Sequence, residues 1–163
     1  MKKYLVIGNP IEHSFSPLIH NHWMKKNKLT NSIYEKKKIE KLDLKNIVNQ
    51  IKNDELKGVN VTVPFKNEII PFLDDLNTTA KITESVNTVL KVGNKIIGYN
   101  TDSQGFSLTI QRPLIEKHIF ILGAGGVTAS IIYALKDDKA KIFVSNRTRE
   151  KANKLKKKFS NIE

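Results

Sequence analysis

Lys66 and Asp102 are the two residues of this sequence whose types and positions best suit proton transfer. Lys66 follows a stretch in which valines alternate with polar residues, as they do in a strand, and Pro64 ends that strand because it donates no ladder hydrogen bond. Asp102 ends the predicted hairpin at 85–102. A lysine beside an aspartate in a partly desolvated cleft can move a proton to or from a hydroxyl or ketone during hydride transfer. Either residue alone is equally well explained as surface charge.

Hydrogen-bonding side chains accompany this pair. Asn60 and Thr62 share the polar face of the predicted strand 59–63, and Asn87 follows the start of the next predicted strand. In α/β sheets, ligands bind beyond the carboxyl ends of the strands. We therefore expect these three side chains to converge with Lys66 and Asp102 over one pocket.

Ser14 and Ser16 lie two residues apart, directly before a predicted helix at 17–27. In an extended segment both hydroxyls point the same way, and at a helix N-terminus they would hold a carboxylate. The alternative is that Ser16 only caps the helix and that Ser14 is exposed.

A glycine loop stands between a predicted buried strand and a predicted helix in IFILGAGGVTASIIYAL. This is the context of a dinucleotide-binding fingerprint: Gly123 turns the chain tightly, and Gly125 lets the backbone approach a pyrophosphate. Thr128 occupies the position of the third glycine. The alternative is a tight turn that binds no ligand.

The second strand after this loop indicates which dinucleotide would bind. About 20 residues after the glycines, NAD-binding sites carry an acidic residue for the ribose hydroxyl. This chain has Asn146, Arg147 and Thr148 there, which suit a 2′-phosphate and therefore NADP(H). Arg147 and Lys151 are alternatively explained as solvated charge at the start of a helix.

Composition excludes several classes of protein. The 163 residues include no cysteine, so a disulfide framework, a thiolate zinc site and a cysteine nucleophile are ruled out. No apolar run is long enough to span a bilayer, and we expect a cytoplasmic protein.

The net charge of +12 invites a nucleic-acid partner, but the lysines are scattered and only three arginines occur. His13, His20 and His22 match no common zinc spacing, so we expect no metal.

Strands alternating with helices predict an α/β fold in two units. The first has an N-terminal, mostly parallel mixed sheet, and the second is the first half of a Rossmann-type domain. We expect the boundary between 1–103 and 104–163. The predicted strands of the first unit are 2–10, 33–39, 59–63 and the hairpin 85–102, and its helices are 17–27, 42–53 and 67–73. The second unit has predicted strands in 117–126 and 141–146, and helices at 128–138 and 149–159.

Six stretches, taken together, resemble shikimate dehydrogenases. They are VIGNPIEHSFSPLIHN, GVNVTVPFK, SVNTV, GYNTDSQGF, ILGAGG and SNRT, in the order and approximate spacing of that family. The resemblance implies NADP-dependent reduction of 3-dehydroshikimate to shikimate in the chorismate and aromatic amino-acid pathway.

The resemblance also implies a role for each candidate residue. Ser14 and Ser16 would bind the substrate carboxylate with Thr62 nearby, and Lys66 would be the acid/base with Asp102 as its partner. Asn87 and Asp102 would hold ring hydroxyls. The loop Gly123, Ala124, Gly125, Gly126 and Val127 would take the pyrophosphate, and Asn146, Arg147, Thr148 and Lys151 would surround the 2′-phosphate.

The chain departs from the family pattern in two ways. Ser103 stands where the family usually has glycine, and the chain ends at Glu163 after two strands of the second unit. We expect a C-terminally truncated member that lacks about 100 residues, judged from a complete dinucleotide domain. The alternatives are a quinate/shikimate dehydrogenase that accepts NAD and a non-catalytic shikimate-binding module. A homodimer is possible.

Overall fold

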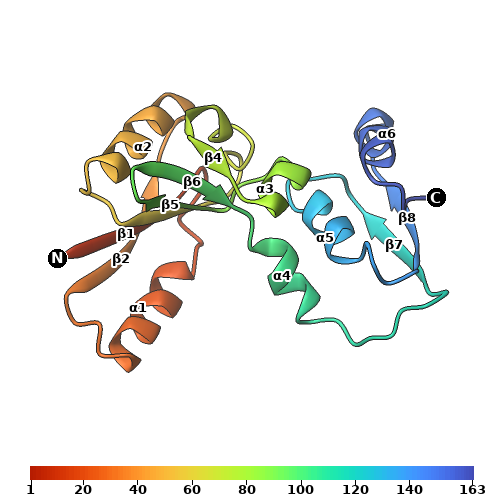
Figure 1. The fold of residues 1–163 in the computed structure, drawn as a ribbon, viewed down its shortest axis with the longest axis horizontal. Helices are drawn as coiled ribbons and strands as arrows, with labels where there is room; N and C mark the ends of the chain where they lie inside the picture. Colours follow the sequence, from red (N-terminus) through yellow and green to blue (C-terminus); the bar gives the residue numbers. More distant parts are fainter.

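The computed structural model describes residues 1–163 as an α/β fold with two sheets, one at each end of the molecule (Figure 1). The six-stranded sheet has the order β2-β1-β3-β5-β6-β4. Its strands are β1 (Lys2–Gly8), β2 (Ser32–Lys38), β3 (Gly58–Val61), β4 (Asp75–Leu76), β5 (Thr88–Val92) and β6 (Lys95–Tyr99). The pairs β1·β2, β1·β3 and β4·β6 are parallel, whereas β5 runs antiparallel to β3 and β6. The predicted α/β class and mixed sheet are confirmed.

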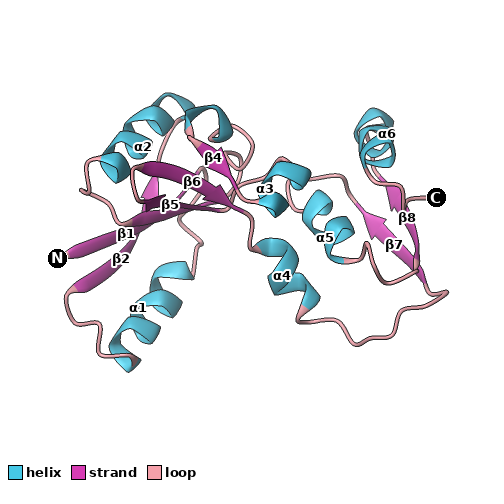
Figure 2. Cartoon of the chain, viewed as in Figure 1, coloured by secondary structure: helices cyan, strands magenta, loops and turns pink.

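Helices cover the first sheet and join it to the second (Figure 2). They are α1 (Ser16–Lys26), α2 (Leu44–Lys52), α3 (Thr78–Thr83), α4 (Asp102–Ser107), α5 (Thr128–Ala134) and α6 (Arg149–Lys158), with short 3₁₀ turns η1 (Lys41–Asp43) and η2 (Ile70–Phe72). The helices α1 and α2 lie on opposite sides of the six-stranded sheet (Figure 1). None of the helices has both the length and the apolar character needed to cross a bilayer.

The apolar stripe of α2 forms one side of the larger core. Leu44, Ile47, Val48 and Ile51, the four positions with helical spacing, are all buried. They pack in one cluster with valines of the sheet, including Val59, Val61 and Val89. Burying such a stripe holds a short helix in place, because an isolated helix of this length is marginal in water.

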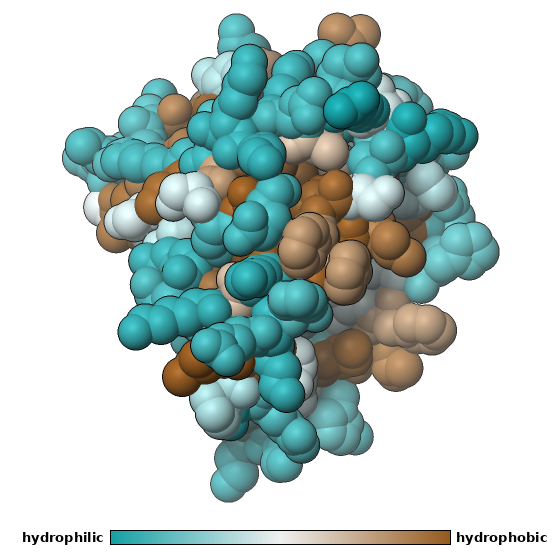
Figure 3. Space-filling view, turned by 90° about the vertical axis from the view of Figure 1, so that its right-hand side faces the viewer, coloured by the Kyte–Doolittle hydropathy of each residue, from teal (hydrophilic) through white to brown (hydrophobic).

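The second sheet consists of β7 (His118–Leu122) and β8 (Lys141–Ser145), which pair in parallel. Ile119 and Ile121 face a core that contains Ile132 of α5. Phe120 and Leu122, which alternate with them, are 69% and 87% exposed, and hydrophobic residues gather on this side of the molecule (Figure 3). All four elements predicted for this unit are present.

Three elements were not predicted from sequence patterns. They are β4 at the edge of the six-stranded sheet, α3 and α4. Asn77 caps α3 by accepting the Ala80 N–H at 2.9 Å, so Asn77 followed by Thr-Thr-Ala is the signal that was overlooked. Helix α4 crosses the expected boundary at 103/104, and α5 packs against both α3 and α4.

Three local predictions were wrong. No α-helix spans 67–73; turns and the 3₁₀ turn η2 take its place, and Pro71 there supplies no N–H for an α-helical bond. The strand β3 ends at Val61, and Val63 is 61% exposed. Ser16 is the first helical residue of α1 and does not cap it with its side chain.

The segment before α1 is also not extended. Phe15 has helical backbone angles, and the Ser16 N–H points to the Ser14 hydroxyl oxygen at 3.3 Å. The expectation that alternation aligns the two hydroxyls therefore fails. Any convergence of Ser14 and Ser16 must come from the turn that precedes the helix.

Candidate active site

Lys66 and Asp102 form an ion pair between two separate elements of the first unit. Lys66 lies in the loop after β3, and Asp102 is the first residue of α4, where a strand end was expected. The Lys66 Nζ is 2.7 Å from Asp102 Oδ2, and the two side chains are 15% and 22% exposed. Both charges are thus largely withdrawn from water, where electrostatic interactions are stronger than on the surface.

Asn87 completes this group and is itself firmly oriented. Its Nδ2 donates to Asp102 Oδ1 at 2.7 Å and to Thr101 Oγ1 at 2.9 Å. Its Oδ1 accepts the Thr101 backbone N–H at 3.0 Å. Both carboxylate oxygens of Asp102 therefore have a partner, and the carboxylate cannot turn without breaking one of these bonds.

Asn60 is connected to this group through the Thr88 hydroxyl. The Tyr34 hydroxyl donates to Asn60 Oδ1 at 2.6 Å, and Asn60 Nδ2 donates to Thr88 Oγ1 at 3.0 Å. The Thr88 hydroxyl in turn donates to Asn87 Oδ1 at 3.1 Å. Burial raises the pKa of the Tyr34 hydroxyl, which keeps it protonated as a donor. We expected the Asn60 side chain to converge on the pocket. Instead, its amide forms hydrogen bonds with Tyr34 and Thr88.

Ser14, Ser16 and Thr62 share a hollow, here called the serine pocket. It has a volume of about 340 Å³ and is also lined by Val6, Pro10, Ile11 and His13. Its polar groups are hydroxyls and an imidazole, which are neutral or positively charged partners for an anion. The two serines are thus brought together despite the unpredicted backbone.

A second hollow, the lysine pocket, joins Lys66 to the glycine loop. It is lined by Val63, Pro64, Lys66, Asn67 and Gly126, with a volume of about 240 Å³. Thr62 of the serine pocket and Val63 of the lysine pocket are consecutive in the chain. The ionisable pair is therefore next to the candidate anion site on one side and next to the candidate cofactor loop on the other.

The glycine loop has a conformation and a clearance that suit close approach by a ligand. Gly123 has φ +114°, which side-chain-bearing residues rarely adopt. A Cβ added at Gly125 or Gly126 would meet no atom within 4 Å, so space is open above the loop. Thr128, in the place of the third glycine, is buried and donates to the Gly123 carbonyl at 3.0 Å.

Asn146 fixes this loop from the neighbouring strand end. Its Oδ1 accepts the Ala124 N–H at 2.9 Å, and its Nδ2 donates to the Thr148 carbonyl at 2.8 Å. The side chain that was expected near a ribose phosphate thus also connects the two segments that would face the nucleotide.

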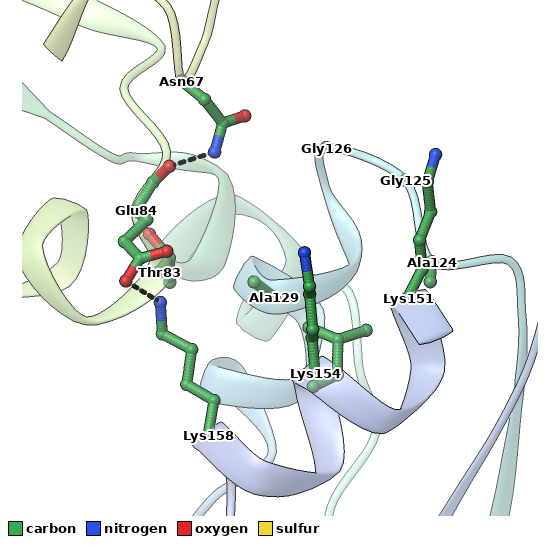
Figure 4. A pocket seen from close by; sticks show the side chains of 11 residues that line it. Asn67, Thr83, Glu84, Ala124, Gly125, Gly126, Ala129, Lys151, Lys154 and Lys158 are labelled. Carbon is green, nitrogen blue, oxygen red and sulfur yellow. Dashed lines mark hydrogen bonds and ion pairs between the residues drawn. The ribbon is translucent and has the colours of Figure 1, made fainter. Parts of the chain in front are cut away.

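Three lysines of α6 line a third hollow, the glycine-loop pocket, of about 350 Å³ (Figure 4). Lys151, Lys154 and Lys158 come from α6, Ala124 to Gly126 come from the loop, and Asn67, Thr83 and Glu84 come from the first unit. Lys158 Nζ pairs with Glu84 Oε1 at 2.8 Å. The excess of positive charge favours a phosphate-bearing ligand. Lys154 and Lys158 were missed, although their spacing from Lys151 already places all three on one helix face.

Two family models match the chain. The model described as the shikimate dehydrogenase substrate binding domain matches residues 6–89, and the model described as shikimate / quinate 5-dehydrogenase matches residues 107–163. The chain belongs to the shikimate dehydrogenase family. The resemblance seen in the sequence is confirmed at this level.

Individual shikimate dehydrogenases are similar over nearly the whole chain. The NADP(+) enzyme of Pelagibacter ubique is 50% identical over 166 residues, which cover 99% of this chain and 62% of that protein. The crystal structure of the Aquifex aeolicus shikimate dehydrogenase has a TM-score of 0.92 at 45% identity, and the match covers 100% of this chain and 62% of that chain. The Thermus thermophilus enzyme, solved with NADP(H) and shikimate, has a TM-score of 0.87 at 32% identity, and the match covers 98% of this chain and 61% of that chain. This chain thus spans about three fifths of the length of these relatives.

The other residues expected near the cofactor phosphates are solvent-exposed. Arg147 is exposed just before α6 and forms no ion pair with a carboxylate. Thr148 is the N-cap residue of α6, and Val127 is 44% exposed before α5. The three histidines near α1 do not gather with other residues into a group that could hold a metal ion.

Removing the Asn146 side chain should loosen the glycine loop. In Asn146→Ala, we expect the Ala124 amide hydrogen to exchange with solvent about 5- to 10-fold faster, because one net hydrogen bond is lost. Hydrogen exchange followed by NMR measures this directly. Asn146→Asp, which keeps an acceptor oxygen, is the matched control. An unchanged Ala124 exchange rate in Asn146→Ala would show that the loop holds its shape without this contact.

Proposed function

We propose that this chain carries the substrate-binding and proton-transfer part of a shikimate dehydrogenase, which reversibly reduces 3-dehydroshikimate to shikimate with NADPH. The supporting observation is the partly buried Lys66–Asp102 pair, which lies beside Gly126 of the glycine loop in the lysine pocket. We assign residues 1–103 to substrate binding and 104–163 to a partial NADP-binding domain.

The serine pocket would hold the substrate carboxylate. Ser14, Ser16 and Thr62 supply hydroxyl donors there, as an anion requires. Asn87 and Asp102 would hold ring hydroxyls next to the carboxylate site. A substrate held at both ends presents its reacting carbon in one orientation, which lowers the entropic part of the barrier.

Lys66 would act as the proton donor during reduction. Its ammonium group gives a proton to the ketone oxygen of the substrate as a hydride from NADPH reaches the ring carbon, and the C=O double bond becomes C–OH. In the reverse direction neutral Lys66 takes the hydroxyl proton. Asp102 keeps Lys66 directed into the cleft, and Asn87 keeps Asp102 from turning.

The residues around the glycine loop fit a dinucleotide phosphate. Residues 123–127 would hold the pyrophosphate over the open space at Gly125 and Gly126. Arg147, Thr148 and Lys151, with Asn146 behind them, would take the 2′-phosphate. These side chains are positively charged or neutral, which suits the extra negative charge of NADP(H).

Replacing Lys66 should separate chemistry from binding. We expect Lys66→Ala to lower kcat for shikimate oxidation by NADP⁺ on the order of 10²- to 10⁴-fold, with the Kd for shikimate changed only a few-fold. Turnover is followed by NADPH absorbance and binding by calorimetry. Lys57→Ala is the matched control, because Lys57 is an exposed lysine paired with Asp54.

Two outcomes would count against this function. An unchanged turnover number in Lys66→Ala would remove Lys66 from the mechanism. Shikimate binding by the unaltered chain without any NADP⁺ reduction would favour a non-catalytic binding module instead.

Arg147 should distinguish the two nicotinamide cofactors. We expect Arg147→Ala to weaken NADP⁺ binding about 10-fold and to leave NAD⁺ binding nearly unchanged, because a charge-assisted bond to the 2′-phosphate is lost. Calorimetric titration with each cofactor measures the difference, and Arg149→Ala controls for loss of charge alone. Equal weakening of both cofactors would contradict the assignment. Preference of the unaltered chain for NAD⁺ would favour a quinate/shikimate dehydrogenase.

A cytoplasmic location and a homodimer also belong to this proposal. Leu18 and Trp23 on α1 are 71% and 54% exposed and offer a second copy an apolar surface. We expect sedimentation velocity to show a dimer that Leu18→Lys converts to a monomer. A monomer at all concentrations of the unaltered chain would rule the dimer out.

A further inference from the structure

Asn100 is a buried amide at the junction of the two units, and all three of its carboxamide contacts are made. It is 4% exposed. Its Nδ2 donates to Thr83 Oγ1 at 2.9 Å and to Ser130 Oγ at 2.8 Å, and its Oδ1 accepts the Asp102 N–H at 3.0 Å. One planar group thus binds α3, α5 and the start of α4.

Two of these contacts lead directly to the candidate active site. Ser130 is fully buried in the first turn of α5, the helix that follows the glycine loop. Asp102 carries the carboxylate that pairs with Lys66. The carboxamide of Asn100 therefore links the helix on the cofactor side to the backbone of the proton-transfer pair through one hydrogen bond to each.

The other polar contacts between the two units are weaker. The Lys158–Glu84 pair is open to solvent, with Glu84 72% exposed, and exposed ion pairs contribute little. The Ser85 hydroxyl reaches the Gly126 carbonyl at 3.3 Å, which is long for an O–H donor. The bond between Asn100 and Ser130 is short and shielded from water.

Burial makes the Asn100 contacts hard to give up. If α5 moved away while the Asn100 side chain stayed in place, this amide, which is 4% exposed, would lose its acceptor at 2.8 Å, and an unsatisfied buried donor is costly. If the carboxamide followed α5, it would pull on the Asp102 N–H and so on the carboxylate that orients Lys66. The position of α5 and the geometry of the ion pair are therefore mechanically connected.

We propose that Asn100 is a positioning residue that holds α5, and with it the glycine loop, in register with the Asp102–Lys66 pair. Its catalytic consequence, alignment of the bound cofactor with the proton donor, rests on the function proposed above. The structural part of the inference does not depend on that function.

Two isosteric substitutions distinguish positioning from simple stability. Ser130→Ala and Thr83→Val each remove one acceptor of the same Asn100 amide, but only Ser130→Ala removes a hydrogen bond to the second unit. Residual dipolar couplings, fitted separately for residues 2–99 and 118–158, report whether the units share one alignment tensor. We expect one shared tensor in the unaltered chain, in Thr83→Val and in Ser130→Thr, and two distinct tensors in Ser130→Ala. A shared tensor in Ser130→Ala, or two tensors in Thr83→Val as well, would overturn the inference.

Kinetics add a second readout. We expect Ser130→Ala to lower kcat about 10-fold with the KM for shikimate unchanged, because a small misplacement of reacting groups is costly while the substrate contacts stay intact. Ser130→Thr should restore kcat. An unchanged kcat in Ser130→Ala, or a kcat in Ser130→Thr as low as that in Ser130→Ala, would contradict positioning. Absence of turnover in the unaltered chain would count against the proposed function, and the dipolar couplings would then decide the inference alone.

Discussion

The partly buried ion pair of Lys66 and Asp102 is the interaction on which the rest of the site depends. Withdrawing two charges from water is costly, and the pair is tolerated only when geometry is good and the remaining hydrogen-bonding capacity is used. Asn87 binds the second oxygen of Asp102, and Thr101 orients Asn87. The side chains around the pair thus explain both why it is stable and why it points in one direction.

The fold supplies this geometry by bringing distant segments to one edge. Lys66 follows β3 at the centre of the six-stranded sheet, whereas Asp102 begins α4 after β6. The antiparallel strand β5 lies between β3 and β6, so Asn87, just before β5, comes between the two charged residues. A mixed sheet is what allows a strand start and two strand ends to meet there.

The polar and charged side chains of the pockets also match the ligands proposed for them. The serine pocket offers hydroxyls, and the glycine-loop pocket offers three lysines of α6. Part of the net charge of +12 is thus concentrated where phosphates would bind, although the lysines looked scattered along the sequence. Helix periodicity gathers Lys151, Lys154 and Lys158 on one face, which composition alone does not reveal.

Local patterns determined much of the fold. The stripe of α2, the Gly93–Asn94 hairpin turn and the strand-loop-helix around Gly123 were all predictable, because burial periodicity and turn chemistry act over a few residues. The order of six short motifs identified the family. Prediction failed at 67–73, where Pro71 and contacts far along the chain outweigh local helix propensity. It also failed at α4, which lies at the expected boundary between the two units.

The sequence by itself therefore determined the chemical types at the site: a lysine, an aspartate, two serines, a glycine loop and a basic helix. Only the tertiary structure decided which of them touch. Asn60 is linked to Asn87 through Thr88, and Asn146 accepts a hydrogen bond from the glycine loop. Asn100, which the sequence analysis did not single out, forms a buried hydrogen bond between the units. The physical reason is that hydrogen-bond partners of buried polar groups are chosen by packing between segments remote in sequence, which no local pattern encodes.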